Sequence, residues 1–268
     1  MKLGISSYTF GWAVGVRGYQ AAHPLDESGL LDKAGELGVS LLQIGDNLPL
    51  IDFDTARIEK LAARAERENV ALEIGSRRLT RDNLAAHIAL SRRLKAKLLR
   101  FVVDDFDYHP APPEIIALLR EAVPLLRDND VVLGIENHDR FPARTLRDII
   151  EAAGSEQIGV CLDTANSLGA GEGIGEVGAT LAPVTVNLHI KDFLIERVPH
   201  QMGFIVSGRP AGEGMMNLPA VLEQLAPFGR CHSAVVELWT PPQPRLEDTV
   251  EKEAAWAHAS FAYLKRYF

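Results

Sequence analysis

The stretch VVLGIENHDRFPARTLRDIIEAAGSEQIGVCLDTAN, residues 131–166, contains in one piece the pattern that the rest of the chain repeats. It opens with the apolar run Val131–Ile135, continues into a helical pattern over Leu146–Ala153, and reaches a second apolar run at Ile158–Leu162. Apolar runs without alternation are typical of strands in a parallel sheet that is covered on both faces. Gly154 stands where a helix C-cap is expected. The stretch therefore predicts a strand, a crossover helix and a second, parallel strand.

The same alternation can be followed from one end of the chain to the other. The other predicted strands are Lys2–Ser7, Ser40–Ile44, Val70–Ile74, Lys97–Val103, Val184–Leu188 and Ser233–Val236. The other helical patterns cover Ser28–Leu37, Asp54–Asn69, Thr80–Lys95, Pro112–Arg127, Leu218–Leu225 and Glu251–Tyr267. The helix between the sixth and seventh strands is the least distinct, because that stretch is rich in glycine.

Eight strand–helix units in 268 residues predict an α/β protein with a single (β/α)8 TIM-barrel domain over residues 1–268. A doubly wound open sheet is the alternative, but its first strand is normally followed by a glycine-rich phosphate-binding turn. Here the turn reads SSYTFGW, residues 6–12. No linker rich in proline, glycine or serine divides the chain, so one barrel is preferred.

Composition limits the partners and the compartment. The 28 basic and 36 acidic residues give a net charge of −8, which disfavours nucleic acid and anionic membranes because both attract positive surfaces. The two cysteines, Cys161 and Cys231, are too few for a disulfide framework or a cysteine-rich zinc site. The chain shows no export signal and no run approaching the roughly 20 apolar residues of a membrane span. We expect a cytoplasmic protein that binds neither nucleic acid nor membranes.

Residues able to bind a metal follow four successive predicted strands: Glu136, Asp163, His189 and Glu237. In a (β/α)8 barrel these strand ends meet at one face. Three carboxylates converging there would repel one another unless a cation neutralised them. One imidazole among oxygen ligands suits Mn²⁺, Mg²⁺ or Co²⁺, and Zn²⁺ is also compatible. The sequence therefore predicts one divalent metal ion at this face.

The motifs around these four residues carry a family resemblance. They read Gly-Ile-Glu136-Asn137-His138, Leu-Asp163-Thr-Ala-Asn166, Leu-His189-Ile-Lys191-Asp192, Gly208-Arg209-Pro-Ala-Gly-Glu213-Gly and the strand-end Glu237. In this order and spacing they resemble the sugar isomerase/epimerase-like superfamily of TIM barrels, which is related to xylose isomerase and the type-2 AP endonucleases. The resemblance covers nearly the whole chain.

The resemblance implies roles for the four strand-end residues. In the keto-sugar 3-epimerases of this superfamily, two glutamates, an aspartate and a histidine bind one divalent metal, and the glutamates also exchange a substrate proton. Glu136 and Glu237 match the glutamates, and Asp163 and His189 match the other ligands. Those epimerases carry a histidine three residues after the aspartate, where this chain has Asn166.

The metal chemistry leaves the reaction open. A divalent cation that holds a carbonyl and the adjacent hydroxyl stabilises an enediolate, from which several reactions can start. We expect an isomerase or epimerase acting on a keto-sugar or keto-sugar acid. A decarboxylase of a 3-oxo sugar acid such as 3-oxoisoapionate, or an inosose-type dehydratase, is the alternative. A non-catalytic sugar-binding barrel or an endonuclease is less expected, since Glu73, Asp104 and Asn166 occupy positions where the nucleases carry histidines.

Further side chains near the strand ends are candidates for the site. Lys191 and His138 each lie two residues beyond a predicted ligand, and we expect both to take part in catalysis. Ion pairing of Lys191 and orientation of a metal ligand by His138 are the alternatives. The predicted substrate-binding residues are Asn166, Arg209, His200, Tyr8 and Trp12. Further candidates for lining the pocket are Gln43, Asp46, Glu73, Arg100 and Asp104.

The long stretch Phe193–Met216 is predicted to be a loop that influences specificity, with the segment around His200 as a lid. The expected partner is a small-molecule sugar or sugar acid. The last helix carries Trp256, Tyr263 and Tyr267 at helical spacing, which predicts packing on the barrel and leaves a homo-oligomer open.

Overall fold

A closed barrel of parallel strands forms the centre of the computed structural model, which describes residues 1–268. The strands are β1 (Lys2–Ser6), β2 (Leu41–Ile44), β3 (Ala71–Arg77), β4 (Leu98–Val102), β5 (Val132–Glu136), β6 (Ile158–Asp163), β7 (Thr185–Ile190) and β10 (Ser233–Val236). They pair in the order β1-β10-β7-β6-β5-β4-β3-β2. β1 pairs with β10 on one side and with β2 on the other, which closes the barrel. The predicted TIM barrel is confirmed.

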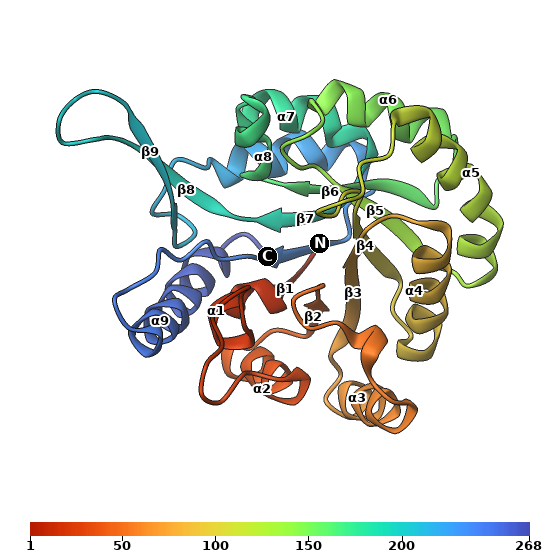
Figure 1. Cartoon of the computed structure of the whole chain (residues 1–268), viewed down its shortest axis with the longest axis horizontal. Coiled ribbons are helices and arrows are strands. Elements are labelled where there is room, and N and C mark those ends of the chain that lie inside the picture. The colour runs from red at the N-terminus through yellow and green to blue at the C-terminus, as the bar shows by residue number, and fades with distance from the viewer.

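Helices surround the barrel (Figure 1). They are α1 (Gly11–Val14), α2 (Glu27–Leu37), α3 (Thr55–Arg67), α4 (Arg81–Leu94), α5 (Pro112–Asp128), α6 (Ala143–Ala153), α7 (Ile174–Leu181), α8 (Leu218–Leu225) and α9 (Leu246–Leu264). The glycine-rich stretch after β6 does contain a helix, α7. Helix α9 begins five residues before the apolar pattern predicted, because Glu247 and Asp248 in its first turn favour a helix N-terminus without being buried. None of the helices is long and apolar enough to span a membrane.

Each helix buries one face against the strands. In α3 the buried residues are Ile58, Leu61 and Ala65, the three that the sequence pattern places together. Gly154 ends α6 in the left-handed region at φ 69°, as expected of a C-cap glycine. The apolar shell between strands and helices fixes the strands, and through them the residues at the strand ends.

The strand register sets the height of the polar residues at the carboxyl-terminal mouth, the face where the strands end. Asp163 on β6 is paired with His189 on β7. Val236 on β10 is paired with Ile190 on β7, so Glu237 follows one step further along the same edge. Residues that are far apart in sequence are thereby brought to one face.

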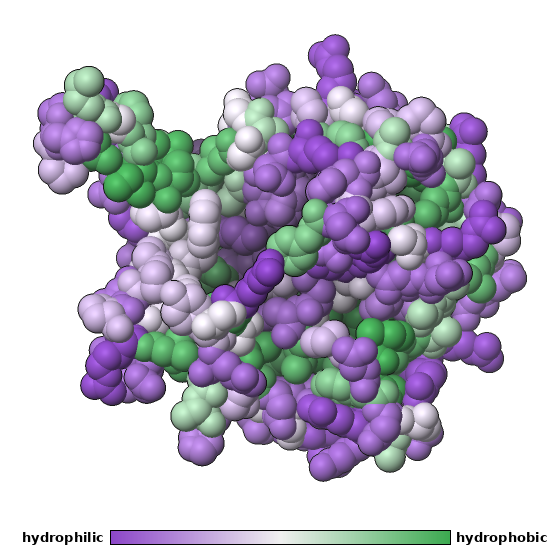
Figure 2. Space-filling model, viewed as in Figure 1, coloured by the Kyte–Doolittle hydropathy of each residue, from purple (hydrophilic) through white to green (hydrophobic).

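A two-stranded antiparallel hairpin occupies much of the segment Phe193–Met216, where the sequence predicted a loop. It consists of β8 (Asp192–Arg197) and β9 (Phe204–Arg209) and extends outward from the barrel (Figure 1). In Figure 2 hydrophobic residues cover the stem of the hairpin while its tip is mainly hydrophilic, and Met202 and Ile205 are among its exposed side chains. The hairpin does not lie over the barrel as a closed lid.

A clamp fixes the base of this hairpin. The buried carboxylate of Asp192 accepts hydrogen bonds from the backbone N–H groups of Gly212 at 2.9 Å and Gly214 at 3.1 Å. Its other oxygen accepts the N–H of Met216 at 3.0 Å. A Cβ atom on Gly214 would lie 2.1 Å from the Asp192 carboxylate, so only glycine permits this approach. The return loop is therefore held against the first residue of β8.

Candidate metal centre

The structure brings the four predicted metal ligands together at the carboxyl-terminal mouth. Glu136 ends β5, Asp163 ends β6, His189 lies in β7 and Glu237 follows β10. All four are buried, with exposures of at most 3%. One ligand atom from each lies within 4.8 Å of those from the others. We call this group the four-residue cluster.

The orientation of His189 fits metal binding. Gln43 donates from Nε2 to Glu73 Oε2 at 3.0 Å, so its Oε1 faces His189 Nε2, 2.7 Å away. His189 Nε2 must therefore carry the proton, which leaves a lone pair on Nδ1. That Nδ1 is buried without a hydrogen-bond partner, 3.2 Å from Glu237 Oε1 and 3.9 Å from Glu136 Oε1.

Asp163 supplies a second free ligand atom. Its Oδ1 accepts the backbone N–H groups of Ala165 and Asn166, both at 2.8 Å, whereas its buried Oδ2 is contacted only by Lys191 Nζ, at 2.8 Å, and keeps a lone pair available. An acceptor lone pair on His189 directed at carboxylate oxygens is unfavourable unless a cation lies between them. The donor set, three carboxylates and one imidazole, fits a divalent metal ion such as Mn²⁺, Mg²⁺, Co²⁺ or Zn²⁺.

Lys191 places a positive charge beside this cluster. Its Nζ lies 2.8 Å from Asp163 Oδ2 and 3.0 Å from Glu237 Oε2, and it is 3.4 Å from Asn166 Oδ1. Burial lowers the pKa of Lys191, but the charges of Asp163, Glu237 and Glu136 outweigh burial and raise the pKa above its ordinary value. Lys191 thus pairs with the cluster and not with its neighbour Asp192.

Glu237 is held as a carboxylate. Burial raises its pKa, yet the nearby positive charges, including Lys191 and Arg100, outweigh burial, so the pKa falls below its usual range. Ser6 Oγ donates to Glu237 Oε1 at 3.2 Å. Sequence reasoning missed Ser6, and its only signal was that a hydroxyl residue ends the first strand.

Both oxygens of Glu136 are occupied by donors. Arg100 Nε donates to Oε2, and Asn166 Nδ2 donates to Oε1 at 2.7 Å. Arg100 also donates from Nη1 to Asp46 Oδ1 at 2.8 Å, and Asp46 Oδ2 accepts the hydroxyl of Tyr8 at 3.1 Å. Burial lowers the pKa of Arg100, but the neighbouring carboxylates raise it well above its ordinary value. A chain of hydrogen bonds therefore fixes Glu136 from the side of β4.

A cavity of about 370 Å³ opens beside the cluster. Among the residues that line it are Tyr8, His138, Asn166, Lys191, Glu237 and Trp239. His138 lies at its edge, partly exposed, with Nδ1 2.8 Å from Asp139 Oδ1. Asp104, a further candidate from the sequence, does not line this cavity, and its Oδ1 lies 2.7 Å from Nη2 of Arg140. The cavity gives a small polar molecule access to Lys191 and Glu237.

Three predicted substrate-binding residues lie outside this cavity. Trp12 donates from Nε1 to Thr240 O at 2.9 Å. Arg209 forms an ion pair of 2.5 Å with Glu196 across the hairpin. His200 is exposed in the hairpin turn and accepts a hydrogen bond only from a local backbone N–H. For these three, substrate binding stays a prediction from the sequence.

Comparison with known proteins places the chain in a family. The family model described as "Xylose isomerase-like TIM barrel" matches residues 31–266. The chain belongs to this family. The 3-oxo-isoapionate decarboxylase of Pectobacterium atrosepticum is 32% identical over 264 residues, covering 98% of this chain and 95% of the relative. The family predicted from the strand-end motifs is therefore confirmed.

Solved structures agree on the fold. D-Psicose 3-epimerase from Clostridium cellulolyticum H10, with D-tagatose, superposes with a TM-score of 0.74 at 17% identity, covering 100% of this chain and 99% of that one. A xylose isomerase-like TIM-barrel protein from Mycobacterium smegmatis, in complex with magnesium, superposes at 0.72 with 17% identity, covering 98% and 97%. The relatives with a named activity are enzymes, as the sequence predicted.

Proposed function

We propose that this protein is a divalent-metal-dependent decarboxylase of a 3-oxo sugar acid. The observation that carries the proposal is the contrast between Lys191 and Glu136. The ammonium of Lys191 lies at the cluster and lines the cavity, whereas both oxygens of Glu136 already accept hydrogen bonds. Decarboxylation needs one proton donor, but epimerisation needs proton exchange on both faces of a carbon. The full-length similarity to a 3-oxo-isoapionate decarboxylase supports this choice.

The four-residue cluster would hold the metal ion through Glu136, Asp163, His189 and Glu237. When bound, the cation supplies Lewis-acid stabilisation of negative charge on the 3-oxo oxygen of the substrate. The bond between C1 and C2 breaks, its electron pair forms a double bond between C2 and C3, and carbon dioxide leaves. Lys191 then donates a proton from Nζ to C2 and recovers one from solvent through the cavity, which gives the shortened ketose.

The surrounding side chains keep this geometry. Arg100 neutralises and orients Glu136, and Gln43 fixes the tautomer of His189. Tyr8 and His138 line the cavity, where we propose that they contact substrate hydroxyl groups. A fixed charge arrangement reduces the reorganisation needed when negative charge moves to the 3-oxo oxygen.

A keto-sugar isomerase or epimerase is the second candidate. Glu136 and Glu237 belong to one cluster, as a two-glutamate proton exchange would require, and the fold is that of D-psicose 3-epimerase. A dehydratase starting from the same enediolate remains the third candidate, because the cluster by itself does not select the leaving group.

One experiment separates these reactions. The protein, loaded with Mn²⁺, Mg²⁺, Co²⁺ or Zn²⁺, is incubated in D₂O with ¹³C-labelled 3-oxo sugar acids and keto-sugars and followed by NMR. Release of labelled carbon dioxide with one deuterium at C2 supports the decarboxylase. Deuterium uptake without carbon loss supports the epimerase, and loss of water supports the dehydratase. Absence of turnover with every metal and substrate would contradict all three.

A matched pair of variants tests the proton donor. Lys191→Met should stop the formation of monodeuterated product, while Lys191→Arg should keep the positive charge and lose most of the proton transfer. Metal content measured by mass spectrometry should remain at one equivalent in both. Full decarboxylase activity in Lys191→Met would remove Lys191 from the proposed mechanism.

A further inference from the structure

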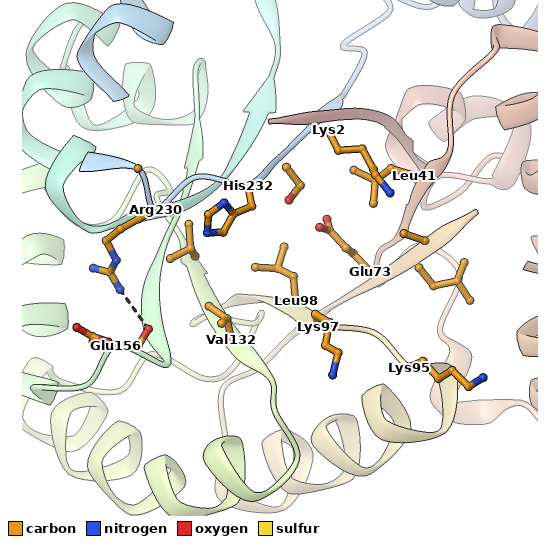
Figure 3. A pocket seen from close by; sticks show the side chains of 15 residues that line it. Lys2, Leu41, Glu73, Lys95, Lys97, Leu98, Val132, Glu156, Arg230 and His232 are labelled. Atoms are coloured by element: carbon orange, nitrogen blue, oxygen red, sulfur yellow. Dashed lines mark hydrogen bonds between the residues drawn. The ribbon is translucent and has the colours of Figure 1, made fainter. Parts of the chain in front are cut away.

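A second cavity lies at the amino-terminal mouth of the barrel, where the strands begin (Figure 3). Its volume is about 470 Å³. It is lined from Lys2 on β1, Leu41 on β2, Leu98 on β4 and Val132 on β5, among others. Among the lining residues, Glu73 is linked to the candidate metal centre through Gln43, and the proposed mechanism uses none of the others.

The walls of this cavity are apolar. They are formed by Leu41, Ala71, Leu72, Leu98, Val132 and Val186. Figure 3 shows Leu41, Leu98 and Val132 around the cavity, with the carboxylate of Glu73 pointing toward its middle. Walls of leucine and valine favour an apolar ligand body, since its burial removes hydrocarbon surface from water.

The rim of the cavity is cationic, although the whole chain carries a net charge of −8. The rim cations are Lys2, Lys95, Lys97 and Arg230, and the two carboxylates of the lining are Glu73 and Glu156. Lys95 and Lys97 each form an ion pair with an exposed carboxylate. Lys2 forms no ion pair, and the hydrogen bonds of Arg230 all go to backbone carbonyls.

The buried carboxylate of Glu73 determines which way round a ligand anion would lie in the cavity. Glu73 is buried, and its Oε2 accepts hydrogen bonds from Gln43 at 3.0 Å and Asn187 at 3.4 Å inside the barrel. A ligand carboxylate placed beside Glu73 would meet a like group in a poorly solvated place. The same carboxylate at the rim would instead face Lys2, which forms no ion pair; Arg230 lies on the opposite side of the cavity (Figure 3).

We propose that this cavity binds an amphipathic organic anion, with its carboxylate at Lys2 and its hydrocarbon body against the leucine and valine walls. The site is separate from the metal centre and goes beyond the proposed reaction. Charge complementarity at the rim and burial of hydrocarbon in the interior both favour binding of the anion. The remaining surface of this acidic protein combines neither feature in this way.

Octanoate is the probe for the test. Protein labelled with ¹³C in leucine and valine methyl groups is titrated with octanoate, and the methyl shifts are recorded. We expect saturable shifts in Leu41, Leu98, Val132 and Val186. Lys2→Gln should weaken binding about two- to fivefold, as for a partly exposed ion pair. Lys33→Gln, which removes a lysine on α2, should leave the dissociation constant unchanged.

A blocking variant completes the test. Leu98→Trp should abolish the shifts by filling the cavity, and its circular dichroism melt reports whether the barrel remains folded. If Leu98→Trp does not fold, Lys2→Gln, which changes an exposed residue, still decides the question. Shifts confined to the hairpin or to the metal centre, or equal affinity in wild type and Lys2→Gln, would overturn the proposal.

Discussion

The two mouths of the barrel are built from the same strands but handle charge in opposite ways. At the carboxyl-terminal mouth, three carboxylates and one imidazole are buried together, and the partly buried ammonium of Lys191 contacts two of the carboxylates. At the amino-terminal mouth, the interior is mostly apolar and the cations stay on the rim. A buried charge cluster is stable only if each charge has a partner, whereas rim charges remain in water. Only the first mouth therefore gathers charged groups that must neutralise one another.

The largest effect is expected where a charged ligand is removed from the cluster. Glu237→Gln loses a carboxylate that both faces His189 and borders the substrate cavity. We expect turnover to fall by about 10³-fold or more, since both metal binding and proton handling are affected. Steady-state kinetics and metal analysis measure it. Glu156→Gln, at the amino-terminal mouth, is the control and should keep full activity. Equal losses of activity in both variants would contradict the assignment of catalysis to the carboxyl-terminal mouth.

The second largest effect is expected when Lys191, the positively charged side chain beside the cluster, is replaced. Lys191→Met removes the ammonium that contacts both Asp163 and Glu237 in metal-free protein. The free energy of unfolding in EDTA should fall by about 3–5 kcal/mol, the usual consequence of breaking a buried ion pair. Mn²⁺ should restore part of it by binding the native state.

The matching change at the other mouth is Lys2→Gln. Because Lys2 is exposed and has no ion pair, this change should alter stability by no more than about 0.5 kcal/mol. Urea titrations of both variants, with and without Mn²⁺, give the comparison. A Lys191→Met protein as stable in EDTA as the wild type would show that the carboxylates need no counter-charge.

Glu253, a buried carboxylate that pairs with no cation, should make the stability of the protein depend on pH. Burial raises the pKa of Glu253 on α9 to about 7, although the N–H groups of Trp12 and Ala13 hydrogen-bond to it. The folded state therefore keeps this proton up to about pH 7, while the unfolded chain releases it near pH 4.5. Stability from this group is fully present below pH 4.5 and is lost as the pH rises toward 7, by about 3 kcal/mol.

The measurement is a series of urea titrations between pH 4 and about 8, on wild type and on Glu253→Gln. The amide cannot ionise, so the difference in unfolding free energy between the two proteins should change across this interval in favour of Glu253→Gln. A constant difference over the interval would show that Glu253 has the same pKa in the folded and unfolded chains.

A smaller effect on the candidate metal centre than that of Glu237→Gln is expected in the polar interior between the two mouths. Gln43→Leu removes the acceptor for the His189 Nε2 proton and leaves the tautomer of His189 unfixed. We expect metal affinity to fall by about 10- to 100-fold, as for other hydrogen-bond partners of metal-binding histidines. Calorimetric titration with Mn²⁺ measures it, with the exposed Gln20→Leu as control. Unchanged affinity in Gln43→Leu would mean that His189 is oriented by packing alone.

The sequence predicted the barrel well because buried parallel strands have a plain apolar signature. The run Val131–Ile135 became β5, and the acidic residue after it became part of the cluster. The ion pair between Arg100 and Glu136 could not be read in this way. It depends on the alignment of β4 with β5, where Phe101 pairs with Ile135, and register is set by three-dimensional packing.

The hairpin was missed for a related reason. Only one residue, Lys191, lies between the end of β7 and the start of β8, so residues 185–197 contain no turn that separates two strands. Ser6 was also missed, because a serine at a strand end is common and its contact with Glu237 depends on closure of β1 against β10. Local patterns identify elements, while the partners of a side chain follow from how the barrel closes.

The Asp192 clamp has a practical consequence for protein engineering. It ties the return loop to the residue next to Lys191, so the base of the hairpin is fixed independently of its turn. A peptide tag or a fluorescent label inserted in the turn at residues 198–203 should therefore leave the catalytic geometry intact. The hairpin turn offers an attachment point for immobilising this barrel with both of its mouths open.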